Sequence, residues 1–179
     1  TGDAKGDKYN SIENLIGSNF NDRLSGDSGS NKITGGKGND SIMGSAGKDT
    51  LKGEAGNDIV NGGADSDTLS GGRGKDTFVF DTALGANNVD KITDFNVIDD
   101  VIHLENAIFK KLTTTGVLSE KHFVANASGT AADKNDRIIY ETDTGYLFYD
   151  ADGTGAAQAI HFATLTPGLA LTEEDFFVI

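Results

Sequence analysis

The stretch that decides the fold is Gly35-Gly36-Lys37-Gly38-Asn39-Asp40-Ser41-Ile42-Met43, followed at once by Gly44-Ser45-Ala46-Gly47-Lys48-Asp49-Thr50-Leu51-Lys52. The second nonapeptide repeats the first in chemistry, with glycine at position one, aspartate at position six and an aliphatic residue at position eight. Extending this frame in both directions gives seven units, from Gly17 to Val79. A fixed period of this kind indicates a repeat architecture in which every unit is one small structural element.

Three columns of different chemistry keep the nine-residue period across the whole segment. Position one is always glycine: Gly17, Gly26, Gly35, Gly44, Gly53, Gly62 and Gly71. Position six is an acid or its amide: Asp22, Asn31, Asp40, Asp49, Asp58, Asp67 and Asp76. Position eight is apolar: Leu24, Ile33, Ile42, Leu51, Val60, Leu69 and Phe78. Chance does not produce three such columns in one register.

The columns predict stacked coils of short strands. The first six positions are rich in Gly, Asn and Asp, which favour turns, and the last three resemble a short strand with one inward side chain. Two nonapeptides then make one coil of turn, strand, turn and strand, so alternate units fall on the same edge. One edge stacks Asp22, Asp40, Asp58 and Asp76, and the other stacks Asn31, Asp49 and Asp67.

The stacked position-six side chains are candidate ligands for Ca²⁺. Neighbouring strands lie ~4.8 Å apart and calcium–oxygen bonds are ~2.4 Å long, so an ion fits between successive coils, with turn carbonyls completing its oxygen shell. The glycines expected to contribute are Gly35, Gly36, Gly38, Gly44, Gly53 and Gly62. We expect about five ions in the roll, between the pairs Asp22/Asp40, Asp40/Asp58, Asp58/Asp76, Asn31/Asp49 and Asp49/Asp67.

The nonapeptide resembles the RTX family (repeats in toxin, or hemolysin-type calcium-binding repeats). This resemblance implies an all-β fold with a calcium-bound parallel β-roll. It also implies the C-terminal region of a larger protein that a Gram-negative bacterium secretes by the type I route. The first unit departs from the family pattern at Ser18 and Phe20, Asn31 replaces an aspartate, and Asp65 stands where glycine is usual. We therefore expect the ends of the array to bind calcium weakly or not at all.

The formal net charge of −13 sets further limits. An acidic excess argues against nucleic acid and anionic membranes as partners, because both require Lys and Arg. The chain has no long apolar run for stable membrane insertion, and the absence of cysteine excludes disulfides and thiolate chemistry. Without calcium, repulsion between stacked carboxylates and the small number of apolar residues predict that the repeats stay unfolded.

The period ends at Val79, which divides the chain into three expected parts. Residues 1–16 form an N-terminal cap or degenerate repeat, with Leu15 in the apolar column, residues 17–79 form the roll, and residues 80–179 form a small β-rich unit. Alternating apolar residues predict strands at 77–81, 91–95, 101–104, 137–141, 146–149 and 159–163. A short helix is expected around Asn106–Lys110.

Two acidic segments of the second half are candidates for one or two more Ca²⁺ ions. Asp94, Asp99 and Asp100 lie in a segment that resembles the one after the repeats in many RTX proteins, where the acids often bind calcium. Asp150 and Asp152 resemble the start of a D-x-D-G calcium loop. The alternative for both segments is an ordinary turn.

The C-terminus ends on acidic and then apolar residues. Thr172 is expected to cap a helical turn with Asp175 at its third position, and Phe176–Ile179 follow. This ending resembles the uncleaved signal that an ABC transporter of type I secretion recognises. The alternative is a last strand that docks on the sheet.

No catalytic constellation is present, and we expect a module without enzymatic activity. Ser28 in Gly26-Asp27-Ser28-Gly29 occupies a variable repeat position, and the three histidines form no metal-ligand motif. We expect a secreted, extracellular module that folds on binding calcium and carries the secretion signal of a larger protein. The alternative is a calcium-dependent adhesin or a module that binds surface polysaccharide. An exposed aromatic stripe would favour the alternative, and the outward repeat positions contain none.

Overall fold

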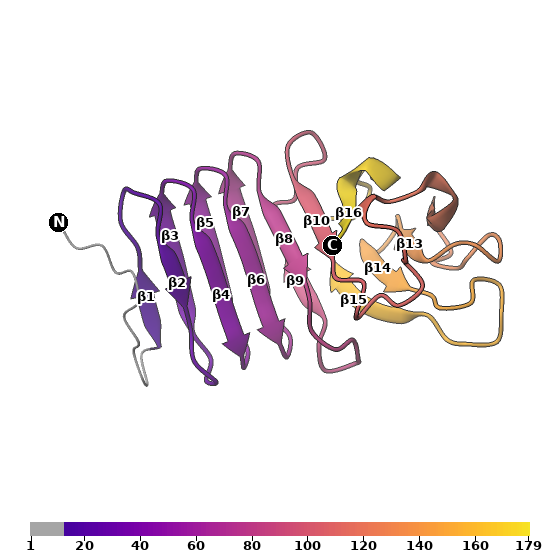
Figure 1. Cartoon of the computed structure of the whole chain (residues 1–179), viewed down its shortest axis with the longest axis horizontal. Coiled ribbons are helices and arrows are strands. Elements are labelled where there is room, and N and C mark those ends of the chain that lie inside the picture. The colour runs from indigo at the N-terminus through magenta and orange to yellow at the C-terminus, as the bar shows by residue number, and fades with distance from the viewer. Residues whose placement is uncertain (1–12) are drawn as a thin grey trace.

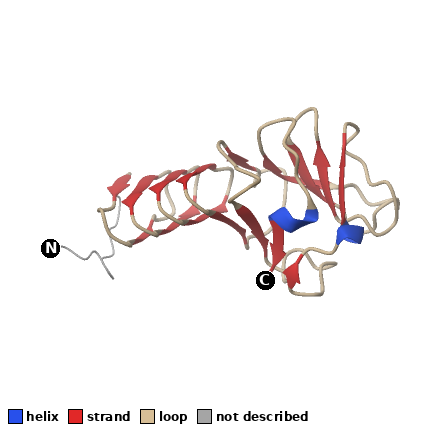
Figure 2. Ribbon diagram, turned by 90° about the horizontal axis from the view of Figure 1, so that it is seen from above, coloured by secondary structure: helices blue, strands red, loops and turns tan. Residues whose placement is uncertain are grey.

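The computed structural model describes residues 13–179 and shows an all-β protein with two long sheets. The repeats form a flattened parallel roll with one sheet on each side, and the second half forms a smaller β-rich unit at the end of the roll (Figures 1 and 2). Most of the expected N-terminal cap lies outside the described residues. Its last part forms β1 (Asn14–Ile16), and Leu15 lies opposite Ile33 as expected.

Each sheet takes every second strand of the roll and then continues into the C-terminal unit. Sheet A runs in the order β1, β3 (Lys32–Lys37), β5 (Thr50–Ala55), β7 (Thr68–Arg73), β9 (Asp90–Ile92), β15 (Ile160–Thr164), β14 (Tyr146–Tyr149), β13 (Ile138–Glu141) and β12 (Phe123–Asn126). Sheet B runs in the order β11 (Gly116–Val117), β16 (Phe176–Val178), β10 (Val101–Leu104), β8 (Thr77–Phe80), β6 (Ile59–Ala64), β4 (Ser41–Ala46) and β2 (Arg23–Ser25).

The register inside the roll confirms the predicted coil of two nonapeptides. Ile33 lies opposite Leu51, and Ile42 lies opposite Val60, so paired residues are separated by two repeat units. The position-eight side chains fill the space between the sheets and are at most 3 % exposed. The apolar column is therefore the core of the roll.

The strands are longer than the sequence indicated. In β4 to β7 each strand covers six residues, from position seven of one unit to position three of the next. The expectation that positions one to three belong to the turn is therefore wrong. Position one can continue the strand because glycine has no side chain to fit between the sheets, and the turn shrinks to positions four to six.

Both sheets run on past Val79, where the nine-residue period ends. Thr68 of β7 pairs with Lys91 of β9, and Thr77 of β8 pairs with Val101 of β10. The sheets then take up β15 and β16 from the C-terminal unit. Residue 79 thus marks the end of the repeat and not the end of the sheets.

The helix expected around Asn106–Lys110 does not form. The N–H groups of Ile108 and Phe109 both donate to the carbonyl of Glu105, which closes a single turn. Phe109 is fully buried, with its ring centroid 5.2 Å from those of Tyr149 and Phe162. The segment therefore serves to place one aromatic ring in the core.

Two short 3₁₀ turns complete the fold, η1 (Glu120–His122) and η2 (Glu173–Asp175). The expected cap at the C-terminus is confirmed: Thr172 and Asp175 form a reciprocal capping box at η2. Among residues 13–179, no helix has the length and apolar character needed to cross a bilayer.

Candidate calcium sites

The position-six carboxylates form a ladder along each edge of the roll. The N–H of Asp22 donates to Oδ1 of Asp40 (2.8 Å), the N–H of Asp40 to Oδ1 of Asp58 (2.7 Å), and the N–H of Asp58 to Oδ1 of Asp76 (2.9 Å). On the other edge, Asn31 N–H donates to Asp49 Oδ1 and Asp49 N–H to Asp67 Oδ1, both at 2.7 Å. The structure thus brings together all five pairs that the repeat predicted.

The second oxygen of each interior carboxylate has no hydrogen-bond partner. These buried atoms are the Oδ2 atoms of Asp40, Asp49, Asp58, Asp67 and Asp76. The five residues are at most 3 % exposed. A buried carboxylate oxygen without a donor carries a large desolvation cost. This arrangement needs a cation or a proton.

Position-one glycines supply the space and the carbonyls around these oxygens. A Cβ built on Gly53 would collide with Oδ2 of Asp58 and with the carbonyl oxygen of Gly71 in the next coil. The same relation links Gly44 to Asp49 and Gly62 O. The Oδ2 atoms of Asp40, Asp49 and Asp58 therefore lie beside a glycine carbonyl of the following coil.

This donor set fits Ca²⁺. Hard cations of this size bind carboxylate and carbonyl oxygens, and both kinds of oxygen meet at the edges of the roll. Among residues 13–179, no three acidic, histidine or cysteine side chains converge as a metal-binding group. Each ion would therefore use one or two carboxylates together with backbone carbonyls. Calcium bound there would supply the positive charge that the unpartnered oxygens lack.

Comparison with known proteins settles the family of the repeats. The family model of the RTX calcium-binding nonapeptide repeat (4 copies) matches residues 16–51 and 43–78. Residues 16–78 are an RTX calcium-binding repeat array. The calcium-binding character and the β-roll expected from the sequence are thereby confirmed.

Solved structures with a similar chain trace include two subunits of the mannuronan C5-epimerase from Azotobacter vinelandii. The AlgE6R2 subunit is 27 % identical, with a TM-score of 0.48 and 90 % of each chain covered. The AlgE6R3 subunit is 28 % identical, with a TM-score of 0.36, and the match covers 89 % of this chain and 79 % of that one. No curated protein matches the chain.

The first two units of the RTX array differ from the interior ones. Oδ2 of Asp22 accepts a hydrogen bond from the N–H of Ser18 (2.5 Å), and Oδ1 of Asn31 accepts one from the N–H of Asp27 (2.9 Å). The oxygen that has no partner in the interior units is thus already satisfied here by the backbone. This geometry supports the expectation of weak binding at the N-terminal end.

Burial raises the pKa of the interior carboxyl groups in the metal-free array. The pKa of Asp67 rises to about 7 and that of Asp76 to about 6, mainly because burial disfavours the charged form. The hydrogen bond from the backbone opposes the shift, and neighbouring carboxylates add to it. The pKa of Asp40, Asp49 and Asp58 is raised for the same first reason.

Both carboxylate ladders continue beyond the repeats, one of them through a residue that the sequence analysis did not predict as a ligand. The N–H of Asp67 donates to Oδ1 of Asp90 (3.1 Å), and the N–H of Asp76 donates to Oδ1 of Asp100 (3.0 Å). Asp100 was predicted as a ligand, but Asp90 was not. The signal was available, because Asp90-Lys91-Ile92 and Asp100-Val101-Ile102 keep the Asp-x-apolar order of positions six to eight without the glycine half of the unit.

The other candidates after the repeats accept hydrogen bonds from nearby backbone and side-chain donors. Asp94 lies at the position-one site of its coil, where its carboxylate accepts hydrogen bonds from Ser70 Oγ and from the N–H groups of Gly71 and Gly72. Asp99 accepts one from the side-chain amide of Asn96 (3.3 Å), and Asp100 Oδ2 accepts one from the N–H of Asn96 (2.9 Å). Asp94 is nevertheless close enough to Asp76 to raise its pKa.

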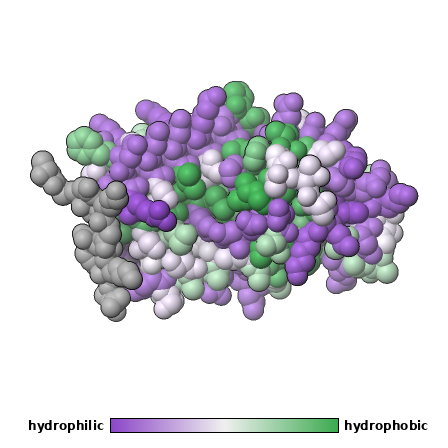
Figure 3. All heavy atoms as spheres, in the orientation of Figure 1, coloured by the Kyte–Doolittle hydropathy of each residue, from purple (hydrophilic) through white to green (hydrophobic). Residues whose placement is uncertain are grey.

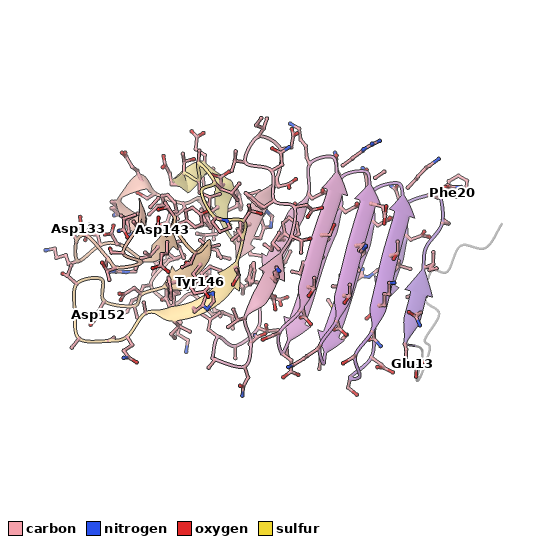
Figure 4. The ribbon with its side chains drawn as sticks, turned by 180° about the vertical axis from the view of Figure 1, so that it is seen from behind. Glu13, Phe20, Asp133, Asp143, Tyr146 and Asp152 are labelled. Carbon is pink, nitrogen blue, oxygen red and sulfur yellow. The ribbon has the colours of Figure 1, made fainter. Side chains whose placement is uncertain are left out.

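The two acids of the D-x-D-G segment lie in a turn that they stabilise themselves. Oδ1 of Asp150 accepts hydrogen bonds from the N–H groups of Asp152 and Gly153. Oδ2 of Asp152 accepts one from the N–H of Ala157 (3.1 Å). Asp152 projects at the tip of the C-terminal unit, on the same side as Asp133 (Figure 4). Both carboxylates thus accept hydrogen bonds that hold the turn in place.

The predicted glycine ligands divide into two groups. The carbonyls of Gly35, Gly44, Gly53 and Gly62 face the position-one glycine of the preceding coil, beside its position-six side chain. Gly71 does the same and was not predicted. Gly36 and Gly38 instead provide positive φ angles of 114° and 110°, and the carbonyl of Gly38 faces Gly56 of the next coil.

Proposed function

We propose that the chain is the calcium-driven folding module of a larger secreted protein. The observation that carries this proposal is the set of five buried carboxylate oxygens without hydrogen-bond partners in the RTX array. In a compartment with little calcium they oppose folding, because each must be desolvated without compensation. Outside the cell, calcium would neutralise both ladders and make the roll favourable.

A calcium titration tests the folding part of the proposal. The far-ultraviolet circular dichroism of the chain is followed from excess chelator to excess calcium. A cooperative gain of β signal is expected at ~0.1–1 mM Ca²⁺, the range of extracellular modules, and magnesium at the same concentration serves as the control. A full β signal in chelator would contradict the proposal, because the apolar core alone would then suffice.

The C-terminal residues support export as an unfolded chain. β16 lies between β10 and β11, Phe176 and Val178 are buried, and the N–H of Ile179 donates to the carbonyl of Leu104 (3.0 Å). A transporter that reads this tail can do so only before β16 joins sheet B. We therefore propose that recognition by a type I transporter precedes folding and that calcium-driven folding outside the cell conceals the tail.

Exposed residues of the tail allow the two roles to be separated. Deleting the tail would also remove β16 from the sheet, so substitutions are preferable. Glu174→Lys with Phe177→Ser changes the acid-then-apolar character at two exposed positions. Secretion from cells with the matching transporter should fall, while the melting temperature of the calcium-loaded protein should change little. Normal secretion of this variant would show that the tail is only a structural strand.

A further inference from the structure

The outer face of sheet A carries a continuous row of polar side chains across six strands. The paired residues are Lys32, Thr50, Thr68, Lys91, Thr164 and Tyr146, from β3 through β5, β7, β9 and β15 to β14. A second, shorter row beside it pairs Thr34, Lys52 and Ser70. With strands ~4.8 Å apart, the first row extends over ~24 Å. We call these residues the lysine face.

The charge of the lysine face is opposite to that of the molecule. Its two rows contain Lys32, Lys52 and Lys91 and no carboxylate, although the chain has 28 acidic and 15 basic residues. All three lysines are exposed, and their side chains form no ion pair or hydrogen bond among residues 13–179. The acids that border the face are Glu54 and Asp94 beside the roll strands, and Glu141, which pairs with Tyr146 at the far end of the first row. Positive charge is therefore free to meet an anionic partner.

One end of the lysine face is an aromatic platform. Tyr146 is 38 % exposed and stacks on the ring of His161, with centroids 4.3 Å apart and an interplanar angle of 29°. Phe148 also contacts His161, with ring centroids 5.3 Å apart, and its ring lies edge to face with that of Tyr146 at 6.2 Å. Tyr146 lies beside the roll strands on the side seen in Figure 4. This is the exposed aromatic group that the repeats themselves lack.

The opposite face of the molecule has a different character. Sheet B presents Met43, Ile59, Val117 and Phe177, which are 36 to 58 % exposed. Hydrophobic side chains gather in the middle of this side of the molecule (Figure 3). A row of lysines that ends at an aromatic platform is thus a feature of sheet A and not of sheet B.

We propose that the lysine face binds an anionic polysaccharide laid across the strands. The three lysines pair with carboxylate or sulfate groups of the chain, the threonine hydroxyls bind sugar hydroxyls, and the platform of Tyr146, His161 and Phe148 stacks on the apolar face of a pyranose ring. A sugar polymer satisfies both halves of the face, because it combines regularly spaced charges with flat rings. A polyanion without rings satisfies only the lysines.

Calcium couples this binding to the folding of the roll. The row exists only when β3, β5, β7 and β9 are paired, so the inference rests on the calcium-loaded state that the proposed function requires. Five bound ions would also change the formal net charge from −13 to about −3, which reduces repulsion of an anionic polymer. The polysaccharide should therefore bind only in the presence of calcium.

Calorimetry on the calcium-saturated chain tests the proposal with short oligogalacturonate and dextran sulfate as probes. The combined change Lys32→Gln, Lys52→Gln and Lys91→Gln should weaken the binding of both probes about tenfold or more. Tyr146→Ala should weaken the binding of oligogalacturonate about fivefold. Tyr146→Phe should leave this affinity unchanged, because the ring is retained. The matched control changes three exposed lysines elsewhere, Lys110→Gln, Lys121→Gln and Lys134→Gln, and should leave the affinity unchanged.

Other probes and the circular dichroism of the same samples define what overturns the proposal. Polyglutamate and single-stranded DNA should bind more weakly than oligogalacturonate, and Tyr146→Ala should not affect polyglutamate. Equal affinity for polyglutamate, an equal loss in the control triple variant, or no binding to a chain with a full calcium-dependent β signal would overturn it. A chain that shows no such signal would instead overturn the proposed folding function.

Discussion

At the scale of single residues, positions one and six of the repeat form one unit of structure. The aspartate at position six places Oδ2 where the side chain of the position-one glycine would otherwise lie, and beside Gly35, Gly44 and Gly53 the next coil brings a glycine carbonyl to the same point. The glycine is therefore required for space and not for backbone freedom. The sequence revealed both columns, but only the structure shows that they meet.

A side chain at position one should destabilise the folded array. Gly53→Ala puts a methyl group against Asp58 Oδ2 and the backbone of Gly71, and we expect a loss of about 1–3 kcal/mol in the free energy of unfolding. The calcium concentration at the folding midpoint should rise accordingly. Gly85→Ala is the control, because no atom lies within 4 Å of a Cβ there. Equal effects of the two changes would contradict the packing described.

Three residues of the array occupy positive φ angles where glycine is more favourable. They are Ser45, Glu54 and Asp65, with φ of 88°, 80° and 74°. Glu54 pairs with Gly36 and Gly72, which adopt the same backbone region. Glu54→Gly should therefore stabilise the calcium-loaded roll by about 1 kcal/mol in urea unfolding. Thr68→Gly, in a regular strand position, should destabilise it, and a loss at both sites would argue against strain at Glu54.

At the scale of elements, periodicity predicted the roll well and the C-terminal unit only in part. The inward column fixed the register because a slip by one residue would expose every core side chain. The strands at 101–104 and 146–149 were also predicted correctly. β11 and β12 were missed, since short strands with mixed exposure carry no clear alternation. The pairing of β15 and β16 with the roll depends on contacts distant in sequence, which a local pattern does not contain.

The continuation of the ladders predicts a calcium role for a residue outside the repeats. Asp90 is buried and accepts the hydrogen bond from Asp67 that a further repeat would accept. Asp90→Asn should therefore raise the calcium midpoint of folding about twofold or more, because it removes a carboxylate next to the unpartnered oxygen of Asp67. Asp143→Asn, at an exposed turn, is the control (Figure 4). An unchanged midpoint in Asp90→Asn would mean that the ladder ends functionally at Asp67.

At the scale of the whole molecule, charge is sorted by location. Buried carboxylates line the two turn edges of the roll, three exposed lysines lie on the outer face of sheet A, and exposed apolar side chains lie on that of sheet B. The composition shows the acidic excess and predicted its link to calcium. It did not predict that acidic, basic and apolar side chains lie on different parts of the molecule. The outward positions of one sheet become neighbours only through pairing between strands that are 18 or more residues apart in the sequence.

The same sorting makes the stability of the metal-free protein depend on pH. Burial, with neighbouring carboxylates adding to it, raises the pKa of Asp67 and Asp90 to about 7 and that of Asp76 to about 6 in the folded state, from an ordinary value of 3.8. A carboxyl group with a raised pKa holds its proton more tightly when folded, so folding takes up protons. Its contribution is fully present below about pH 4 and is lost as the pH rises through about 6 to 7.

Protons should therefore replace calcium in part. In excess chelator, the β signal and the melting temperature should be higher at about pH 5 than at about pH 8. In the presence of calcium the midpoint should shift the other way, to higher calcium concentration at the lower pH, because protons and the ion compete for the same oxygens. The combined change of Asp67, Asp76 and Asp90 to Asn serves as the control and should flatten the pH dependence in chelator. A metal-free β signal that stays constant or grows from pH 5 to pH 8 would show that these buried carboxylates do not control folding, since each of them would have to ionise within the roll at no cost.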